Sequence, residues 1–344
     1  MNQVRWGIIG CGDVCEKKSG PALYKTAGSV LLSVMRRDAA KAADFAKRHG
    51  VARSSDDASA IIDDPEIDIV YIATPPGTHC DYALRVAAAG KHCYVEKPMA
   101  RNGVEAARMV DAFASAGRKL FVAYYRRRLP VFLRARQLLE DGAIGKLTGI
   151  CHRHTSPAHR RTDGWRVDAE QSGGGIFMDL ASHVFDVLDY ITGPFSDVAG
   201  HAANIASDYA VEDTVSVAWR NPAGVVGSSH WNFASDVADE RIELLGTEGS
   251  IMWRAFGTPI LRLTRGTSVQ EFNEPYPEHV HQPLVQTIVD ELLGRGSDAS
   301  TRCPSTGTSA LRTQIVLDQC LAGYYGGRSD EFWLRQDNWP GRRR

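Results

Sequence analysis

Three side chains that could exchange protons recur along one predicted helix. Asp179, His183 and Asp186 are spaced by four and three residues, which places them along one stripe of a helix. Histidine titrates near neutral pH and suits proton transfer, and a carboxylate one turn away can fix its tautomer. We predict that this stripe faces an enclosed polar cleft. A satisfied, partly buried histidine is the alternative, and a metal site is disfavoured because no further ligand cluster accompanies Asp179 and His183.

A second candidate for chemistry is the run Glu96-Lys97-Pro98, which follows a predicted strand. The residue before a proline is kept out of the helical region, so Lys97 is expected to be extended at the edge of a cleft. An ammonium group there can bind a substrate hydroxyl or carbonyl oxygen and favour its more negative form. The alternative is an exposed loop lysine.

A glycine turn follows the first apolar run of the chain. Its positions are Gly10, Gly12, Asp13, Val14 and Cys15. A strand that leads into a glycine turn and then a helix places backbone N–H groups against a pyrophosphate, so we expect a dinucleotide here. Cys15 stands where a third Gly or Ala is usual, and its thiol is small enough to be tolerated.

The end of the second predicted strand bears on the choice of dinucleotide. It reads Arg36-Arg37-Asp38. Arginine accommodates a 2′-phosphate, whereas an acidic side chain grips a ribose 2′-hydroxyl, so NADP is favoured over NAD. Asp38 keeps NAD open, because it could either reach the ribose or cap the next helix.

Other residues could meet the cofactor or the substrate. Thr74 and Pro75 end a further strand where a nicotinamide ribose would pass, and His79 could touch the cofactor or simply begin a helix. Trp165 and Arg166 could close over a nicotinamide or stack on a sugar, with ordinary loop packing as the alternative. The arginines of residues 126–128 could reach a ligand or form interdomain surface.

The first third of the chain alternates strand and helix. The expected strands are Val4–Ile9, Val30–Met35, Ile67–Ala73, His92–Glu96 and Lys119–Ala123. The expected helices are Asp13–Thr26, Asp38–His49, Asp56–Ile62, Thr78–Ala89 and Val104–Ala116. Short apolar strands between amphipathic helices predict a doubly wound parallel sheet of the Rossmann type, an α/β fold. The domain is expected to span residues 1–124.

The pattern changes after Tyr124. A helix over Pro130–Glu140, a strand over Lys146–Thr155 and a helix over Phe177–Thr192 are expected, followed by consecutive strands from Ser196 to about Phe272 and a helix over Ser305–Tyr325. Strands without intervening helices predict an open, mostly antiparallel sheet in an α+β domain over residues 125–344. Substrate is expected at the carboxyl ends of the parallel strands, between the domains.

Composition narrows the class of protein. The 344 residues contain 40 basic and 41 acidic side chains, with 43% hydrophobic residues, so we expect neither nucleic acid nor a membrane as partner. The N-terminus enters a predicted strand almost at once, so we expect no signal peptide. Seven cysteines in no disulfide-like or metal-like spacing predict a reducing, cytoplasmic location, and the three terminal arginines are expected to be a solvated tail.

In order and spacing these motifs resemble the glucose–fructose oxidoreductase/inositol dehydrogenase/MocA-type (Gfo/Idh/MocA) family, over nearly the whole chain. The resemblance implies that Lys97 and His183 act at the substrate with Asp179 beside them. It also implies that the Arg36-Arg37 and Trp165-Arg166 pairs bind NADPH, as in the anhydrofructose reductase-like branch, and that the chain forms a homodimer or homotetramer.

The expected activity is hydride transfer between NADP or NAD and a carbinol or carbonyl carbon of a sugar, a polyol or a related cyclic hydroxy compound, without a metal. Two alternatives remain open: a nicotinamide-dependent glycosidase without net redox change, and a ligand-sensing relative without catalysis. The presence of Lys97 and His183 disfavours the second.

Overall fold

The computed structural model describes residues 2–157, 164–295 and 302–342. The chain divides into two compact units, which are described separately. The first contains residues 1–100, 105–128 and 277–311, and the second contains residues 101–104, 129–276 and 312–344.

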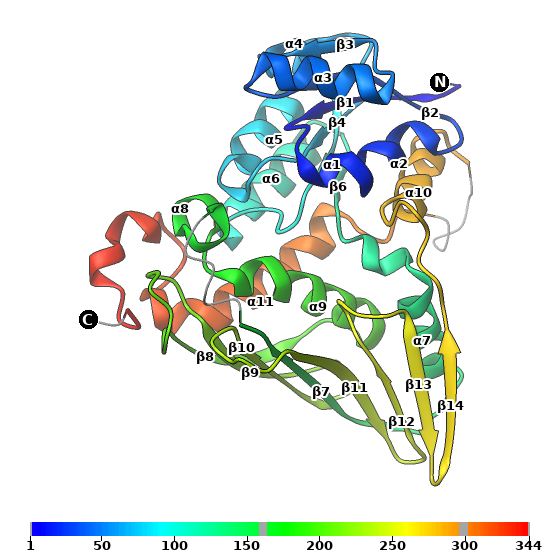
Figure 1. Ribbon diagram of the computed structural model, residues 1–344, viewed down its shortest axis with the longest axis vertical. Helices are drawn as coiled ribbons and strands as arrows, with labels where there is room; N and C mark the ends of the chain where they lie inside the picture. The colour runs from blue at the N-terminus through cyan, green and yellow to red at the C-terminus, as the bar shows by residue number, and fades with distance from the viewer. Residues whose placement is uncertain (1, 158–163, 296–301, 343–344) are drawn as a thin grey trace. The chain divides into compact units, whose positions relative to one another are not determined.

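The first unit is built on a parallel sheet of six strands in the order β3-β2-β1-β4-β5-β6, as the sequence predicts for a Rossmann fold (Figure 1). Its strands are β1 (Val4–Ile9), β2 (Ser29–Met35), β3 (Arg53–Ser55), β4 (Ile69–Ile72), β5 (His92–Val95) and β6 (Leu120–Val122). Its helices are α1 (Asp13–Lys17), α2 (Gly20–Lys25), α3 (Ala39–His49), α4 (Ser59–Ile62), α5 (His79–Ala88), α6 (Gly103–Ser115) and α10 (Gln282–Leu292).

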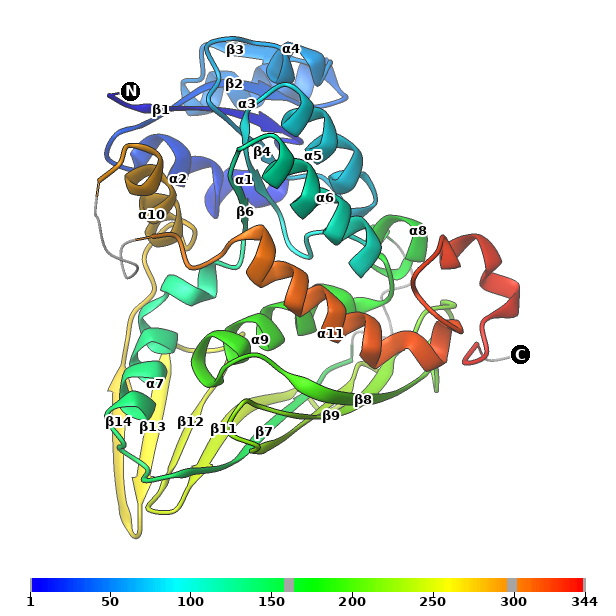
Figure 2. The same ribbon diagram turned by 180° about the vertical axis from the view of Figure 1, so that it is seen from behind.

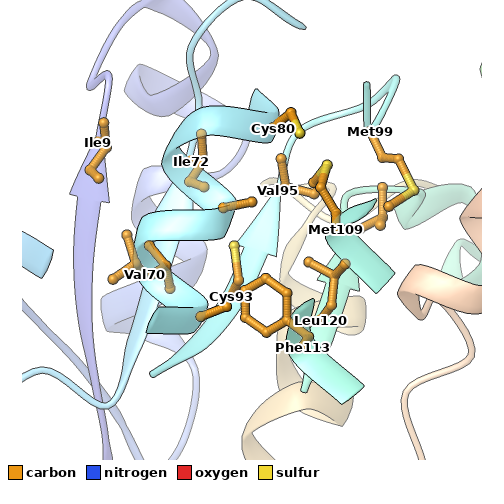
Figure 3. Packing of buried hydrophobic residues seen from close by; sticks show 14 of the residues in the cluster. Ile9, Val70, Ile72, Cys80, Cys93, Val95, Met99, Met109, Phe113 and Leu120 are labelled. Atoms are coloured by element: carbon orange, nitrogen blue, oxygen red, sulfur yellow. The ribbon is translucent and has the colours of Figure 1, made fainter. Parts of the chain in front are cut away.

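Apolar side chains cover both faces of this sheet. On one face Ile9, Val70 and Val95 pack with residues of α5 and α6 such as Met109 and Phe113, all of them buried (Figure 3). On the other face the strands pack against α2, α3 and α10. Strands buried on both faces explain the nearly continuous apolar runs of the sequence.

Two segments of the first unit differ from the sequence prediction. The single helix expected over Asp13–Thr26 is wrong, because α1 ends at Lys17 and α2 begins after Ser19. Pro21 lies in the first turn of α2, where its missing N–H needs no partner and its fixed φ favours a new helix start. The helix α10 was not predicted.

The second unit contains a sheet of eight strands in the order β14-β13-β12-β11-β7-β10-β9-β8. Its strands are β7 (Leu147–Thr155), β8 (Ser196–Ala203), β9 (Thr214–Arg220), β10 (Val226–Asn232), β11 (Asp239–Gly246), β12 (Ser250–Trp253), β13 (Ile260–Arg265) and β14 (Ser268–Asn273). All neighbouring pairs are antiparallel except β7 and β10, which are parallel, so the expected mostly antiparallel sheet is confirmed.

One face of this sheet carries the core of the second unit. The helices of this unit are α7 (Pro130–Glu140), α8 (Ala169–Ser172), α9 (Ile176–Thr192) and, from Arg312 onward, α11 (Gly307–Tyr325). Of these, α9 and α11 lie side by side (Figure 2). Trp231 of β10 contacts Phe177 and Phe185 of α9 edge to face. The alternate residues, such as Cys151 and His230, are exposed, so the opposite face of the sheet is open.

Candidate functional site

The glycine turn joins the ends of three strands of the first unit. Gly10 has a φ of +90°, and its N–H donates to the carbonyl of Met35 at the end of β2. A Cβ at Gly10 would lie 2.7 Å from Cγ2 of Thr74, just beyond β4. Both the backbone conformation and this close approach therefore require glycine at position 10.

Gly12 plays a different part in the same turn. It is the N-cap of α1, with φ −104° and ψ −161° and no side-chain cap. A Cβ at Gly12 would have no neighbour nearer than the carbonyl oxygen of Gly10, at 3.9 Å. The turn thus presents open space and the backbone N–H groups of Asp13 and Val14 at a helix start, which fits a pyrophosphate.

Cys15 occupies the third motif position without disturbing the turn. Its side chain is fully buried, and its thiol lies 3.9 Å from the carbonyl oxygen of Gly10. Burial raises the pKa of Cys15 above its usual range, so the thiol is a small packed group rather than a nucleophile.

The charged residues that follow β2 have different surroundings. The Asp38 carboxylate accepts a hydrogen bond from the backbone N–H of Lys41 (3.1 Å) and pairs with the Lys41 ammonium (3.3 Å), so it caps α3. Arg36 is half-buried, with Nη1 3.5 Å from the carbonyl oxygen of Cys11 in the glycine turn, and Arg37 is exposed.

The segment after β5 is held by a buried carboxylate. Glu96 is 7% exposed, and its Oε1 accepts a hydrogen bond of 2.5 Å from the hydroxyl of Tyr71 on β4. Its Oε2 accepts from the backbone N–H of Lys97 at 3.1 Å. The imidazole Nε2 of His281, at the start of α10, lies 3.8 Å from Oε1.

His79 lies between the segments that follow β4 and β5. It is the first residue of α5 and fully buried. Its Nε2 lies 2.7 Å from the carbonyl oxygen of Thr74, and its Nδ1 lies 3.1 Å from that of Pro98. Burial lowers the pKa of His79 to about 4, so the ring is neutral and its single N–H donates to one of these two carbonyl oxygens. Pro75 precedes the short 3₁₀ turn Pro76–Thr78 that leads into this helix.

In the second unit, the glycines that precede α9 pack closely against Glu212. Gly173 and Gly174 have φ of +78° and +158°, and the N–H of Gly175 donates to the buried carboxylate of Glu212 (2.9 Å). A Cβ at Gly175 would lie 2.6 Å from the carbonyl oxygen of Glu212. The three glycines therefore set the register of α9, and with it the direction of Asp179.

The polar stripe of α9 consists of buried side chains. Asp179 is 8% exposed and His183 is 5% exposed. Arg166 donates from Nε to the Asp179 carboxylate at 2.7 Å, and its guanidinium lies over the ring of Trp165 at 4.3 Å. Arg166, which was predicted to contact the cofactor, thus forms an ion pair with Asp179, the predicted catalytic carboxylate.

The third member of the stripe has a different environment. Asp186 is fully buried and accepts a hydrogen bond from the hydroxyl of Thr313 on α11, at 3.4 Å. One turn further along, Asp189 forms an ion pair with Arg312 of α11 (2.7 Å). These two carboxylates therefore fasten α9 to α11, which leaves Asp179 and His183 as the candidates for proton chemistry on this helix.

His154 of β7 lies near His183 and was not predicted from the sequence as a candidate site residue. Its ring stacks on Trp231 and shares an aromatic neighbour, Phe256, with His183. Neither ring nitrogen has a hydrogen-bond partner within the described residues, and burial lowers the pKa of His154 to about 4. The inward alternation of Ile150, His152 and His154 was the signal that could have found it.

Among residues 2–157, 164–295 and 302–342, no group of three or more His, Cys, Asp or Glu side chains is placed to hold a metal ion. No helix in these ranges is long and apolar enough to cross a membrane.

The parallel sheet, the open glycine turn and the second, mostly antiparallel sheet define a two-domain oxidoreductase with an NAD-binding domain. Two family models match the chain: the oxidoreductase family with an NAD-binding Rossmann fold over residues 4–124, and the GFO/IDH/MocA C-terminal domain over residues 132–252. The chain belongs to the Gfo/Idh/MocA oxidoreductase family.

Known proteins are similar over almost the full length. Oxidoreductase P35 of Formosa agariphila is 37% identical, covering 92% of this chain and 98% of the relative. The 1,5-anhydro-D-fructose reductase of Ensifer adhaerens is 29% identical, covering 92% and 96%. Among solved structures, the aldose-aldose oxidoreductase of Caulobacter crescentus in complex with glycerol has the same fold, with a TM-score of 0.81, 24% identity and coverage of 93% and 98%.

Proposed function

We propose that this protein is an NAD(P)-dependent dehydrogenase or reductase that acts on a CH–OH group of a sugar, a polyol or a related cyclic hydroxy compound. The observation that carries the proposal is the buried Asp179–His183 pair on α9, in a chain whose first unit has a glycine turn open at Gly12. The relatives named as sugar reductases and inositol dehydrogenases support the substrate class.

The dinucleotide, when bound, supplies or accepts the hydride. His183 holds or receives the proton of the reacting hydroxyl, which suits an imidazole at neutral pH. Lys97 binds the same oxygen through its ammonium group and stabilises its negative charge.

Asp179 binds a substrate hydroxyl or orients His183. Its partner Arg166 affects both roles, because it contacts the same carboxylate. The 2.7 Å ion pair with Arg166 gives this nearly buried carboxylate a cationic partner. Substrate that displaces Arg166 must offer Asp179 a hydrogen-bond donor, and a sugar hydroxyl is such a donor. The ion pair therefore favours polyhydroxylated substrates over apolar alcohols.

We propose NADP as the preferred cofactor. The cap formed by Asp38 leaves the half-buried Arg36 and the exposed Arg37 to meet a 2′-phosphate. The proposed cofactor residues are Gly10, Gly12, Asp13, Val14, Arg36, Arg37, Thr74, Pro75, His79, Glu96, Lys97, Trp165 and Arg166. A cytoplasmic homodimer or homotetramer is proposed as well, supported by the seven free cysteines and the open sheet face.

The proposal is tested by cofactor titration followed by turnover. Fluorescence titration with NADPH and NADH establishes binding, and 1,5-anhydro-D-fructose, levoglucosan and myo-inositol then serve as probe substrates. Lys97→Ala and His183→Ala are expected to lower turnover by about 10²–10⁴-fold, as for a positioned proton-transfer group. The exposed Lys41→Ala is the control. Wild-type turnover in both variants would overturn the assignment, as would a folded protein that binds neither cofactor.

A further inference from the structure

The carboxylate of Glu96 sits in a buried network that joins three segments of the first unit. Tyr71 of β4 donates to its Oε1 at 2.5 Å, and burial together with the charge of Glu96 raises the pKa of Tyr71 well above its usual value. The hydroxyl therefore stays protonated and remains a donor. Residue 281, almost two hundred positions later in the chain, approaches the same oxygen at 3.8 Å.

His281 is itself held in a fixed orientation. Its Nδ1 forms a hydrogen bond of 2.9 Å with the hydroxyl of Tyr94 on β5, and its ring packs on Tyr125 with centroids 4.4 Å apart. Burial and the nearby cations Lys18, Arg126 and Lys97 lower the pKa of His281 to about 3. The ring is neutral, so it packs beside Glu96 as an uncharged polar group and not as a counter-ion.

The network ends on the backbone of Lys97. Oε2 of Glu96 accepts the N–H of Lys97 at 3.1 Å, which fixes the peptide plane that precedes the lysine side chain. On the other side of Lys97, the carbonyl oxygen of Pro98 lies 3.1 Å from the imidazole of His79. Buried polar side chains thus lie on both sides of Lys97: Glu96 accepts its N–H, and the ring of His79 packs against the carbonyl group of Pro98.

We propose that Glu96 is a positioning residue, which acts on the reaction through Lys97 and is itself aligned by Tyr71. The inference rests on the proposed role of Lys97. A carboxylate that is 7% exposed and accepts from Tyr71 and from the Lys97 backbone has its oxygens committed inside the protein. A lysine on a loop would otherwise sample many positions, and a displacement of about 1 Å at a reacting group can lower a rate by about 10²-fold.

Two buried tyrosines provide a matched pair of variants. Tyr71 and Tyr94 lie on neighbouring strands, both fully buried, with their rings stacked 4.9 Å apart. Each substitution by phenylalanine deletes one buried hydroxyl, but only the hydroxyl of Tyr71 bonds to Glu96. Tyr71→Phe is expected to lower kcat about tenfold or more with little change in the affinity for NADPH, whereas Tyr94→Phe stays within about twofold of wild type.

Glu96→Gln is the conservative variant of the same test. Glutamine keeps one oxygen acceptor for either Tyr71 or the Lys97 amide, so it should retain more activity than Glu96→Ala. In the Lys97→Ala background, Tyr71→Phe should cause no further loss, because the residue through which it acts is gone. A merely structural effect of Tyr71→Phe would lower the residual rate again.

A readout without substrate completes the experiment. Hydrogen exchange followed by mass spectrometry on peptides spanning residues 93–99 reports the Lys97 amide. Its exchange should accelerate in Tyr71→Phe and Glu96→Ala and stay unchanged in Tyr94→Phe. Equal kinetics and equal exchange in the two tyrosine variants would overturn the positioning role. Full activity of Lys97→Ala would instead overturn the proposed function, while the exchange result would still report whether Glu96 holds the Lys97 amide.

Discussion

The two glycines of the turn after β1 should fail in opposite ways when each is replaced by alanine. Gly10 has a φ of +90° and no room for a Cβ, whereas Gly12 has an ordinary extended conformation and open space beside it. Gly10→Ala is therefore expected to damage the fold. Gly12→Ala is expected to leave the fold intact and to remove cofactor binding.

The magnitudes follow from the geometry. A left-handed conformation for alanine costs roughly 1–2 kcal/mol, and the contact of 2.7 Å with Thr74 adds to it. Gly10→Ala should thus lower the free energy of unfolding by at least about 2 kcal/mol. Gly12→Ala should change it by less than about 1 kcal/mol, in the stabilising direction, because alanine restricts the unfolded chain. Its methyl group stands where a pyrophosphate would approach, so the Kd for NADPH should rise by at least about tenfold.

Denaturant unfolding followed by circular dichroism and NADPH titration followed by fluorescence measure the two effects independently. Gly50→Ala, a change at a helix end with a φ of +67° and nothing within 4 Å of its Cβ, is the control for strain without a clash. Wild-type NADPH affinity in Gly12→Ala would refute the placement of the cofactor at this turn. Wild-type stability in Gly10→Ala would refute the steric argument.

Two further predictions concern pH and the charged residues after β2. Because the folded-state pKa of His281 is about 3, the unfolded chain binds more protons at this residue below about pH 6.5, so His281 should remove about 2 kcal/mol of stability between pH 7 and pH 5. Denaturant unfolding at the two pH values should show a loss that is smaller than the wild-type loss by about this amount in His281→Phe, and an unchanged loss in the exposed-site control His201→Ala. Asp38→Ala should lower the denaturant midpoint slightly, through loss of the helix cap, without changing the NADPH-to-NADH affinity ratio, whereas Arg36→Ala should reduce that ratio. A shift of the ratio in Asp38→Ala would reassign the carboxylate to the ribose.

Local sequence patterns were sufficient for most of the elements. The strand Val4–Ile9 and the helix Pro130–Glu140 have the bounds that the sequence predicts, because apolar periodicity and a proline at the helix start are local signals. The strand β3, over Arg53–Ser55, escaped prediction because three polar residues have no periodicity. The parallel pairing of β7 with β10 is set by distant segments, and no local pattern reports it.

Local sequence patterns also predicted part of the candidate site, and tertiary packing determined the rest. The Asp179–His183 spacing predicts two side chains on one helix, and both are buried on α9. The partners of the site residues could not be predicted, because hydrogen bonds such as Arg166 to Asp179 and contacts such as His281 to Glu96 join segments by tertiary packing. The role of Asp38 could not be predicted from the motif alone, since a helix cap and a ribose ligand require the same residue type.

The return of residues 277–311 to the first unit imposes an order on biosynthesis. Roughly 150 residues separate Arg128 from Pro277, and at about 5–20 residues per second a ribosome needs roughly 8–30 s to translate them. During that interval the sheet face formed by Trp6 and Tyr94 lacks the buried side chains of α10, from Leu284 to Val289. The nascent chain therefore exposes an aggregation-prone apolar surface until α10 has been translated. We therefore expect a chaperone that shields this apolar surface during translation to raise the yield of active protein.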